Sequence, residues 1–330
     1  MIRSIALLAL ALLLDARLLL GAGIEMARKE GEVVLYTTMV VSDFQVFQKA
    51  LARKYPFLKV NHVRLGASTL VARGVAEFRA GKYLTDVYGV TPDSMNYMRE
   101  QGILAPYTSP ETKFIHKGFI DPKGFWSGIN TDILVTGVNT AQLNIKRAPH
   151  SYADYLKPEF KGKMAFHIGT INPLIGLSEL YGDEKALAYM RSFAKQDVIQ
   201  HNGYTKISEL LAAGEFSIVA FMQVTILEKF RERGGPVDWL PLDPSLATVS
   251  SVAIAKNAPH PNAARLLLDF YLSEEGQKTL REIDKMPLRL GVEPNSKRLA
   301  DLIEQSPHVI RYDGDPGKYV KQFNEIFLGR

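Results

Sequence analysis

The first third of the chain alternates between two hydrophobic periods. Short runs of β-branched and apolar residues predict strands at residues 32–38, 59–65 and 85–90. After each run, apolar residues recur every three or four positions, which predicts a helix. This order, repeated three times, favours a largely parallel sheet with helices on both faces. Ligands of such sheets bind beyond the carboxyl ends of the strands.

Residues typical of helix starts follow the predicted strands. Ser42 and Gln45 are spaced as a capping box, Ser68 is a natural N-cap, and Pro92 suits a first helical turn. These helices are therefore expected to begin just beyond the strand ends. Their free backbone N–H groups and helix dipoles would favour an anion there.

A second strand–helix unit follows. Residues 125–140 read as two apolar runs around a turn, and residues 160–167 add a strand. The other elements expected here are helices at 173–180, 184–195 and 205–214, a strand turning into a helix over 216–230, and strands at 237–243 and 248–256. A helical pair comes next, with Ser273 capping its second member. Two such α/β units joined by extended crossovers predict two lobes with a cleft between them.

Composition and motifs exclude several functional classes. At 46% hydrophobic and 23% charged residues, the 330-residue chain is long enough for two globular lobes. Its net charge of +5 is spread among acidic residues, without a basic helix or aromatic–basic motif, so no nucleic acid is expected. Nucleotide-binding, zinc-protease and serine-hydrolase motifs are missing, and a chain without cysteine has no thiol catalysis. We therefore expect no catalytic residue and no cofactor.

The N-terminus has the layout of a secretory signal peptide over residues 1–23. Arg3 precedes an apolar stretch that is too short to span a bilayer, and small residues follow at 21–23. Asp15 and Arg17 interrupt the pattern, which leaves a mis-assigned start or a retained amphipathic helix as alternatives. Because the chain has no cysteine for lipid attachment, an exported form is expected free in the periplasm.

Two segments resemble a known family. They read "EGEVVLYTT…FQKALARKYPFLKVNHVRLGASTLVARGVAEF…TDVYGV" and "AAGEFSIVAFM…SSVAIAKNAPHPNAARLLLDFYLSEEGQKTL". Both are similar to extracellular solute-binding proteins of ABC importers, with spacing most like the ferric-ion-binding branch. The resemblance implies a type II periplasmic-binding fold, a monomer, and delivery of a small solute to a membrane permease and its ATPase. It divides the chain into lobe 1, residues 24–128 with 246–295, and lobe 2, residues 129–245 with 296–330.

The loops after the strands are the expected ligand-binding positions. They comprise Thr37, Thr38, Met39, Ser68, Thr69, Thr91 and Asp93 in lobe 1, and Gly169, Thr170, Tyr204, Phe221, Met222, Gln223 and Thr225 in lobe 2. Hydroxyls and backbone N–H groups would hold an anion, the Gln223 amide would orient an organic solute, and Phe221 and Met222 would add apolar contact. The alternatives are a plain cap for Ser68, a structural first-turn acid for Asp93, and core packing for Tyr204 and Met222.

The ferric ligands that the resemblance implies are absent. Its adjacent tyrosines fall on Val224 and Thr225, its histidine near Met39 or Val40, and its glutamate near Thr91. None of these side chains supplies the anionic oxygen that suits a ferric ion. We therefore expect no metal site and favour a small organic, anionic solute.

Three alternatives remain open at this point. One is ferric binding through atypical ligands, and another is a metal site assembled from Asp93, His167 and Tyr204. The third is a soluble sensor that feeds a signalling partner.

Overall fold

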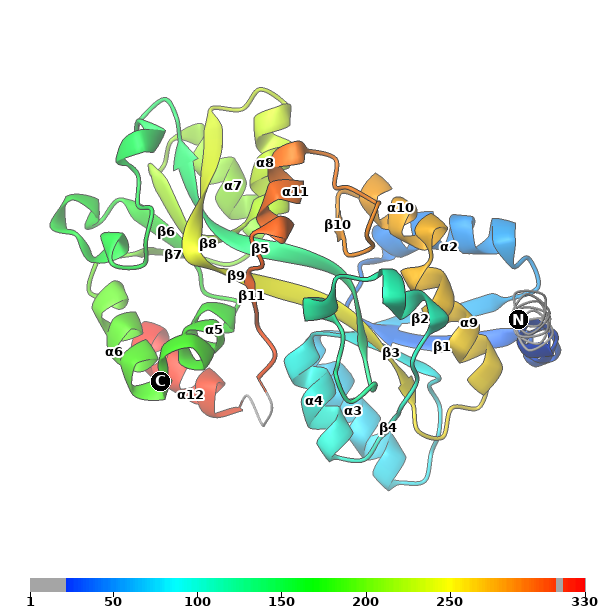
Figure 1. Ribbon diagram of the computed structural model, residues 1–330. Coiled ribbons are helices and arrows are strands. Elements are labelled where there is room, and N and C mark those ends of the chain that lie inside the picture. The colour runs from blue at the N-terminus through cyan, green and yellow to red at the C-terminus, as the bar shows by residue number, and fades with distance from the viewer. Residues whose placement is uncertain (1–21, 313–316, 330) are drawn as a thin grey trace, which may run out of the picture.

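The computed structural model describes residues 22–312 and 317–329 and consists of two lobes side by side (Figure 1). The expected signal peptide lies outside the described residues except for Ala22 and Gly23, which begin a helix over residues 22–30. No helix in the described part of the chain is both long and apolar enough to span a membrane.

The elements predicted for the first third are present in lobe 1. They are β1 (Glu32–Thr37), α2 (Val41–Lys54), β2 (Lys59–Arg64), α3 (Ala67–Arg79), β3 (Val87–Val90), α4 (Pro92–Glu100) and β4 (Leu104–Ala105). Strand β1 pairs in parallel with both β2 and β3, which confirms the parallel arrangement. Apolar residues of α2, Phe44, Phe47 and Leu51, are buried in the core as their helical spacing predicts.

Lobe 2 repeats this arrangement. Its strands are β6 (Met164–His167), β7 (Ile199–His201) and β8 (Ile218–Gln223), and its helices include α5 (Asn172–Tyr181), α6 (Asp183–Ala194), α7 (Tyr204–Ala213) and α8 (Val224–Glu232). Strand β6 lies between β7 and β8 and is parallel to both. The helices predicted for this region are confirmed.

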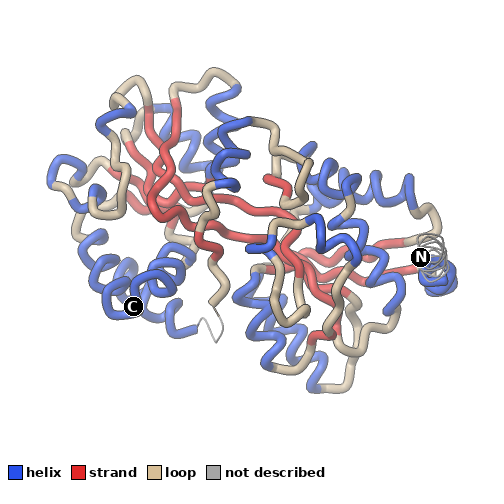
Figure 2. Tube along the Cα trace, in the orientation of Figure 1, coloured by secondary structure: helices blue, strands red, loops and turns tan. Residues whose placement is uncertain are grey.

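Two long strands, β5 (Ser127–Asn139) and β9 (Val237–Ala255), belong to both lobes (Figure 2). They pair with each other in antiparallel fashion and occupy the centre of the sheet, whose order is β2-β1-β3-β9-β5-β8-β6-β7. Two predictions are therefore wrong. No turn interrupts residues 125–140, and residues 237–243 and 248–256 belong to one strand. Polar residues interrupt the apolar pattern because both strands leave one core and enter another. Two of the predicted lobe boundaries, between residues 128 and 129 and between 245 and 246, fall inside these strands.

The last fifth of the chain contributes to both lobes. Its elements are α9 (Pro261–Leu272), α10 (Glu274–Glu282), β10 (Met286–Pro287), α11 (Lys297–Glu304), β11 (His308–Val309) and α12 (Gly317–Leu328). Short 3₁₀ turns complete the description: η1 (Pro110–Phe114), η2 (Lys117–Phe119), η3 (Ile145–Arg147), η4 (Asp154–Leu156) and η5 (Pro158–Phe160). Helix α10 packs on α2 of lobe 1, and α12 packs on α5 and α6 of lobe 2.

Helix caps are partly as predicted. Ser273 accepts a hydrogen bond from the Gly276 N–H and caps α10 as expected. The capping box at Ser42 is wrong, because α2 begins at Val41 with Val40 as its N-cap and without a side-chain cap. The Ser68 cap is also wrong, because α3 begins at Ala67 and its N-cap is Gly66, two residues before Ser68.

Candidate functional site

The carboxyl ends of β3 and β8, the strands that flank the central pair β5 and β9, point toward each other from the two lobes. Val90, the last residue of β3, pairs with Ser251, which is the residue nearest lobe 2 among those of β9 that pair with β3. Gln223, the last residue of β8, pairs with Leu134, which is the residue nearest lobe 1 among those of β5 that pair with β8. Between these pairs, β5 and β9 cross from one lobe to the other, and in this crossing segment Asp132 lies opposite Thr248. The candidate site is built around this crossing.

The loop after β1 is packed closely against β3. Thr37 is buried, and its Oγ1 accepts a hydrogen bond from the Met39 N–H at 3.1 Å. A Cβ on Gly89 would lie 2.5 Å from that oxygen, so this position requires glycine. Thr38 and Met39 are half-buried, and Val40 at the end of this loop is exposed.

The start of α3 is the exposed helix end of lobe 1. Ser68 and Thr69 are exposed, no side chain caps the helix, and its first turn contains no acidic residue. The N–H groups of this turn are therefore available to an anion.

The start of α4 differs, because Asp93 is buried in its first turn. Burial raises the pKa of Asp93, as does Glu179 from α5 of lobe 2, whereas hydrogen bonding to Thr91 works in the opposite direction. Glu179 itself accepts hydrogen bonds from the Arg311 N–H at 3.0 Å and pairs with His308 at 2.8 Å. Asp93 therefore faces lobe 2 as a buried first-turn acid, and Thr91 beside it is half-buried.

His167 organises the loop after β6 in lobe 2. Its Nδ1 accepts hydrogen bonds from the N–H groups of Gly169 and Gly203, each at 3.2 Å. The Gly169 N–H is thus already used within the protein, although it was expected to face a ligand. Burial lowers the pKa of His167, which keeps the imidazole neutral. Tyr204 lies with its ring 4.2 Å from the His167 ring.

Thr170 of this loop lies beside Tyr204, the first residue of α7. Thr170 Oγ1 accepts a hydrogen bond from the Asn172 N–H at 3.2 Å. Burial raises the pKa of Tyr204, hydrogen bonding to Thr170 lowers it, and the charge of Asp132 raises it further. Tyr204 is therefore a neutral phenol that lies within the electrostatic reach of Asp132.

Asp132 was not predicted as a site residue. Its Oδ1 accepts hydrogen bonds from the N–H groups of Ile133 at 2.9 Å and Thr225 at 3.4 Å, and its Oδ2 accepts one from Thr225 Oγ1. Burial raises the pKa of Asp132 to about 6, against the opposing effects of these hydrogen bonds and of Lys285. A single carboxylate between two apolar runs was the available sequence signal, and it was read as part of a turn.

The strand-to-helix corner at residues 221–225 divides into core and accessible positions. Phe221 and Met222 are 1% and 0% exposed, and Phe221 packs among the rings of Tyr155, Phe166 and Phe193. The expected apolar contact with a ligand is therefore replaced by core packing. Gln223 and Thr225 are half-buried. Within the described residues, no hydrogen bond holds the Gln223 side-chain amide.

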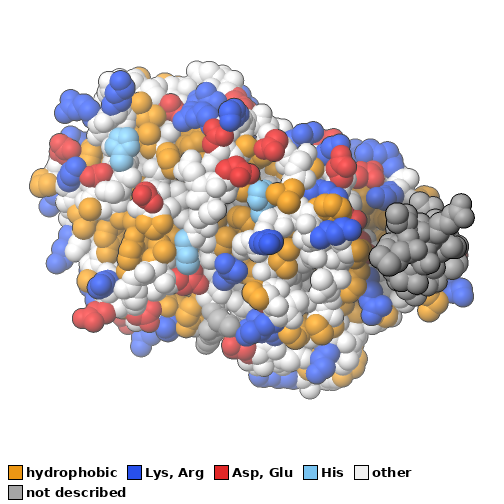
Figure 3. Space-filling view, in the orientation of Figure 1, with side chains coloured by type: hydrophobic (Ala, Val, Ile, Leu, Met, Phe, Trp, Pro, Cys, Tyr) orange, Lys and Arg blue, Asp and Glu red, His pale blue; other side chains and the backbone are white. Residues whose placement is uncertain are grey.

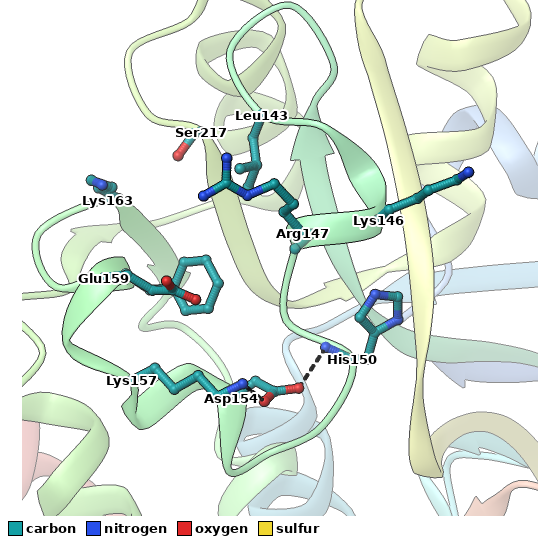
Figure 4. A pocket seen from close by; sticks show the side chains of 11 residues that line it. Leu143, Lys146, Arg147, His150, Asp154, Lys157, Glu159, Lys163 and Ser217 are labelled. Carbon is teal, nitrogen blue, oxygen red and sulfur yellow. Dashed lines mark hydrogen bonds and ion pairs between the residues drawn. The ribbon is translucent and has the colours of Figure 1, made fainter.

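A pocket of about 320 Å³ lies elsewhere on lobe 2 (Figure 4). Its lining includes Arg147, Lys163 and Ser217, and the last two directly precede β6 and β8. The pocket is thus at the amino ends of these strands, opposite to the ends where ligands of such sheets bind. Basic and acidic residues are also intermingled over the visible face of the protein (Figure 3), as expected for a diffuse surface charge.

Comparison with known proteins decides the family. Residues 85–313, more than half of the chain, match the model described as bacterial extracellular solute-binding protein. The chain belongs to this solute-binding family. An uncharacterized protein of Haemophilus influenzae is 30% identical over 280 residues, 79% of each chain. A periplasmic protein of Salmonella typhimurium named for 2-aminoethylphosphonate binding is 23% identical over 266 residues, 77% of this chain and 75% of its own.

Solved structures show the same fold for this solute-binding protein. Iron-bound HitA from Pseudomonas aeruginosa has a TM-score of 0.79 at 20% identity, covering 89% of this chain and 99% of HitA. AfuA from Actinobacillus pleuropneumoniae, with exogenous fructose-6-phosphate bound, has a TM-score of 0.72 at 22% identity, covering 90% and 99%. The predicted type II periplasmic-binding fold is confirmed. Members of this solute-binding family are binding components of transport systems and not enzymes.

The positions at which the resemblance places the ferric tyrosines, Val224 and Thr225, lie at the start of α8. Val224 is buried, and the Thr225 hydroxyl is bonded to Asp132. In the part of the chain that the structure describes, no three His, Asp or Glu residues are grouped so that they could hold a metal ion. His167 Nδ1 already accepts two N–H groups, so in the alternative metal site only the Nε2 of His167 could bind the metal.

Proposed function

We propose that the chain is the periplasmic substrate-binding component of an ABC importer and captures a small organic solute with an anionic group. The chemistry between the facing strand ends carries the proposal. Exposed or half-buried hydroxyls and an amide, from Ser68, Thr69 and Gln223, stand there together with the uncapped start of α3. These groups donate hydrogen bonds to an anion and make poor ferric ligands.

The relatives support an organic anion. One is named for 2-aminoethylphosphonate and a structural neighbour holds fructose-6-phosphate, and both ligands are small organic molecules with a charged phosphorus group. HitA binds iron, but the phenolate pair that the ferric branch uses has no counterpart at Val224 and Thr225. The phosphonate and phosphate-ester ligands therefore match this site better than iron does.

Transport would follow from lobe closure. Strands β5 and β9 connect the lobes, so bending or twisting of this two-stranded segment brings the strand ends together. A solute that contacts both lobes stabilises the closed form by its differential affinity for that form. We further propose that the protein is exported to the periplasm, acts as a monomer, and delivers the solute to a permease coupled to an ATPase.

A thermal-shift and native mass spectrometry screen tests the solute class. The panel contains phosphonates, phosphorylated sugars, carboxylates, polyamines, thiamine and ferric salts. A true solute at a hundredfold excess over its Kd stabilises the protein by about 3 kcal/mol, which raises the Tm by several degrees. Stabilisation by ferric salts alone, with a tyrosinate charge-transfer band, would overturn the proposal.

The variant Ser68→Asp tests the place of the anion. A carboxylate in the first turn of α3 would occupy its positive end, stabilise the helix, and weaken binding of an anionic solute by about tenfold. The matched control, Ser192→Asp, places the same charge on an exposed position of α6 and should leave affinity unchanged. Equal affinity of both variants, measured by calorimetry, would place the anion elsewhere.

A further inference from the structure

Asp132 is unusual within its strand. Every other residue of β5 is buried, and Asp132 alone is half-buried. Its antiparallel partner Thr248, on the crossing segment of β9, is also half-buried. The one acidic side chain of β5 therefore lies, less deeply buried than its neighbours, where the chain passes from one lobe to the other.

Asp132 also caps α8 from a neighbouring strand. Gln223 holds the N-cap position without a side-chain cap, whereas Asp132 accepts hydrogen bonds from both the N–H and the hydroxyl of Thr225. The positive end of α8 is thus already matched by a carboxylate of the protein. A second anion here would be repelled, so this side of the site does not suit the anionic group of a solute.

The basic residues around Asp132 are paired with other carboxylates. Lys285 forms an ion pair with Asp43 at 3.0 Å, and Lys229 pairs with Asp284. No ion pair to Asp132 is found among the described residues. Two titratable groups interact electrostatically with Asp132 at longer range, Lys285 and the neutral phenol of Tyr204. Among the described residues, Asp132 is therefore a carboxylate without an ion-pair partner of its own, affected only by the charge of Lys285, in a position where burial works against its charge.

We propose that the solute carries a cationic group, such as an ammonium, that pairs with the Asp132 carboxylate, in addition to its anionic group. This inference rests on the proposed function and narrows it to dipolar solutes, of the chemical class of aminoalkyl phosphonates and amino-substituted phosphate esters. The anionic end then lies toward α3 of lobe 1 and the cationic end toward Asp132 on the crossing strand. Such a solute bridges the lobes and favours the closed form.

Calorimetry with matched probe pairs tests this pairing. Each pair differs only in the amine: 2-aminoethylphosphonate against ethylphosphonate, and 2-aminoethyl phosphate against ethyl phosphate. The wild-type protein should bind the aminated member about tenfold or more tightly than its partner. Asp132→Asn should abolish this ratio, whereas the control Asp284→Asn should retain it. Because the ratio is measured within one variant, a loss of stability from the missing helix cap does not imitate the effect.

The pH dependence gives an independent readout. With the Asp132 pKa at about 6, the ratio of wild-type to Asp132→Asn affinity for the aminated probe should fall about tenfold from pH 7 to pH 5. The phosphorus group of the probe also titrates at about pH 6, but it does so equally for both proteins and cancels in this ratio. Equal binding of both members of each pair, unchanged in Asp132→Asn, would overturn this inference and leave the proposed function standing. Binding of ferric iron alone would overturn both.

Discussion

Replacement of Glu228 by glutamine should destabilise lobe 2 substantially. Glu228 on α8 is buried, and it accepts hydrogen bonds from Arg231 Nε and an Arg231 terminal nitrogen, each at 2.8 Å, and from Trp239 Nε1 at 2.7 Å. Burial works to raise the pKa of Glu228, but hydrogen bonds from Arg231, Ser296 and Trp239 outweigh it and lower the pKa from 4.5 to about 2. The carboxylate is therefore stabilised in its charged form.

The size of the effect follows from this pKa. The difference between the ordinary pKa of 4.5 and the folded-state pKa of about 2 corresponds to about 3 kcal/mol, at about 1.4 kcal/mol for each pKa unit. The Arg231 side chain is 35% exposed, so solvent screens part of its attraction, and we expect the free energy of unfolding to fall by about 2 kcal/mol in Glu228→Gln. Because the folded-state pKa is lowered, this contribution is fully present above pH 4.5 and is lost as the pH falls toward 2.

Urea unfolding followed by tryptophan fluorescence measures this loss. In a Trp126→Phe background the remaining Trp239 reports on lobe 2, where its indole touches Glu228. The exposed Glu232→Gln on the same helix is the matched control and should change stability by less than about 0.5 kcal/mol. A loss below about 1 kcal/mol at pH 7, or an equal loss at pH 7 and pH 3, would refute the reasoning.

The junction between α9 and α10 supports two further predictions. A Cβ on Gly276 would lie 1.9 Å from the Phe270 backbone oxygen, so Gly276→Ala should cost about 3 kcal/mol of stability in urea unfolding. The control Gly118→Ala meets no atom within 4 Å and should be nearly neutral; equal losses would show that the contact with Phe270 is unimportant. Ser273→Ala removes the cap of α10 and should lower the Tm by an amount equivalent to about 1 kcal/mol, whereas Ser192→Ala, on the exposed face of α6, should not. An unchanged Tm in Ser273→Ala would contradict the role of the cap.

Most elements of the fold follow from local pattern. Strand β1 and helix α2 were predicted because the apolar residues of each face a single core. Strands β5 and β9 were not predicted as continuous, because their central residues, such as Asp132 and Thr248, lie between two cores. A strand that leaves one hydrophobic environment for another carries polar residues at its midpoint, and from sequence this pattern is the same as that of a turn.

The candidate site was predicted as far as it follows from strand ends. Ser68 and Thr170 lie just beyond such ends and Gln223 is the last residue of β8, so their places follow from position alone, while their roles in binding stay predictions. Phe221 was misjudged, because the direction of its side chain depends on a backbone φ of 54° at this corner that the sequence does not reveal. Asp132 was missed because its role depends on β5 passing beside the start of α8, a contact between segments far apart in the chain.

The position of β9 in the sheet also sets an order for making the protein. Strand β9 lies between β3 and β5, although both precede it in the chain. Neither lobe can complete its sheet until residues 237–255 have been synthesised, since they supply a central strand to each. A nascent chain shorter than this lacks the partner that covers the edges of β3 and β5. Each lobe can therefore complete its sheet only late in synthesis, after about three quarters of the chain has been made.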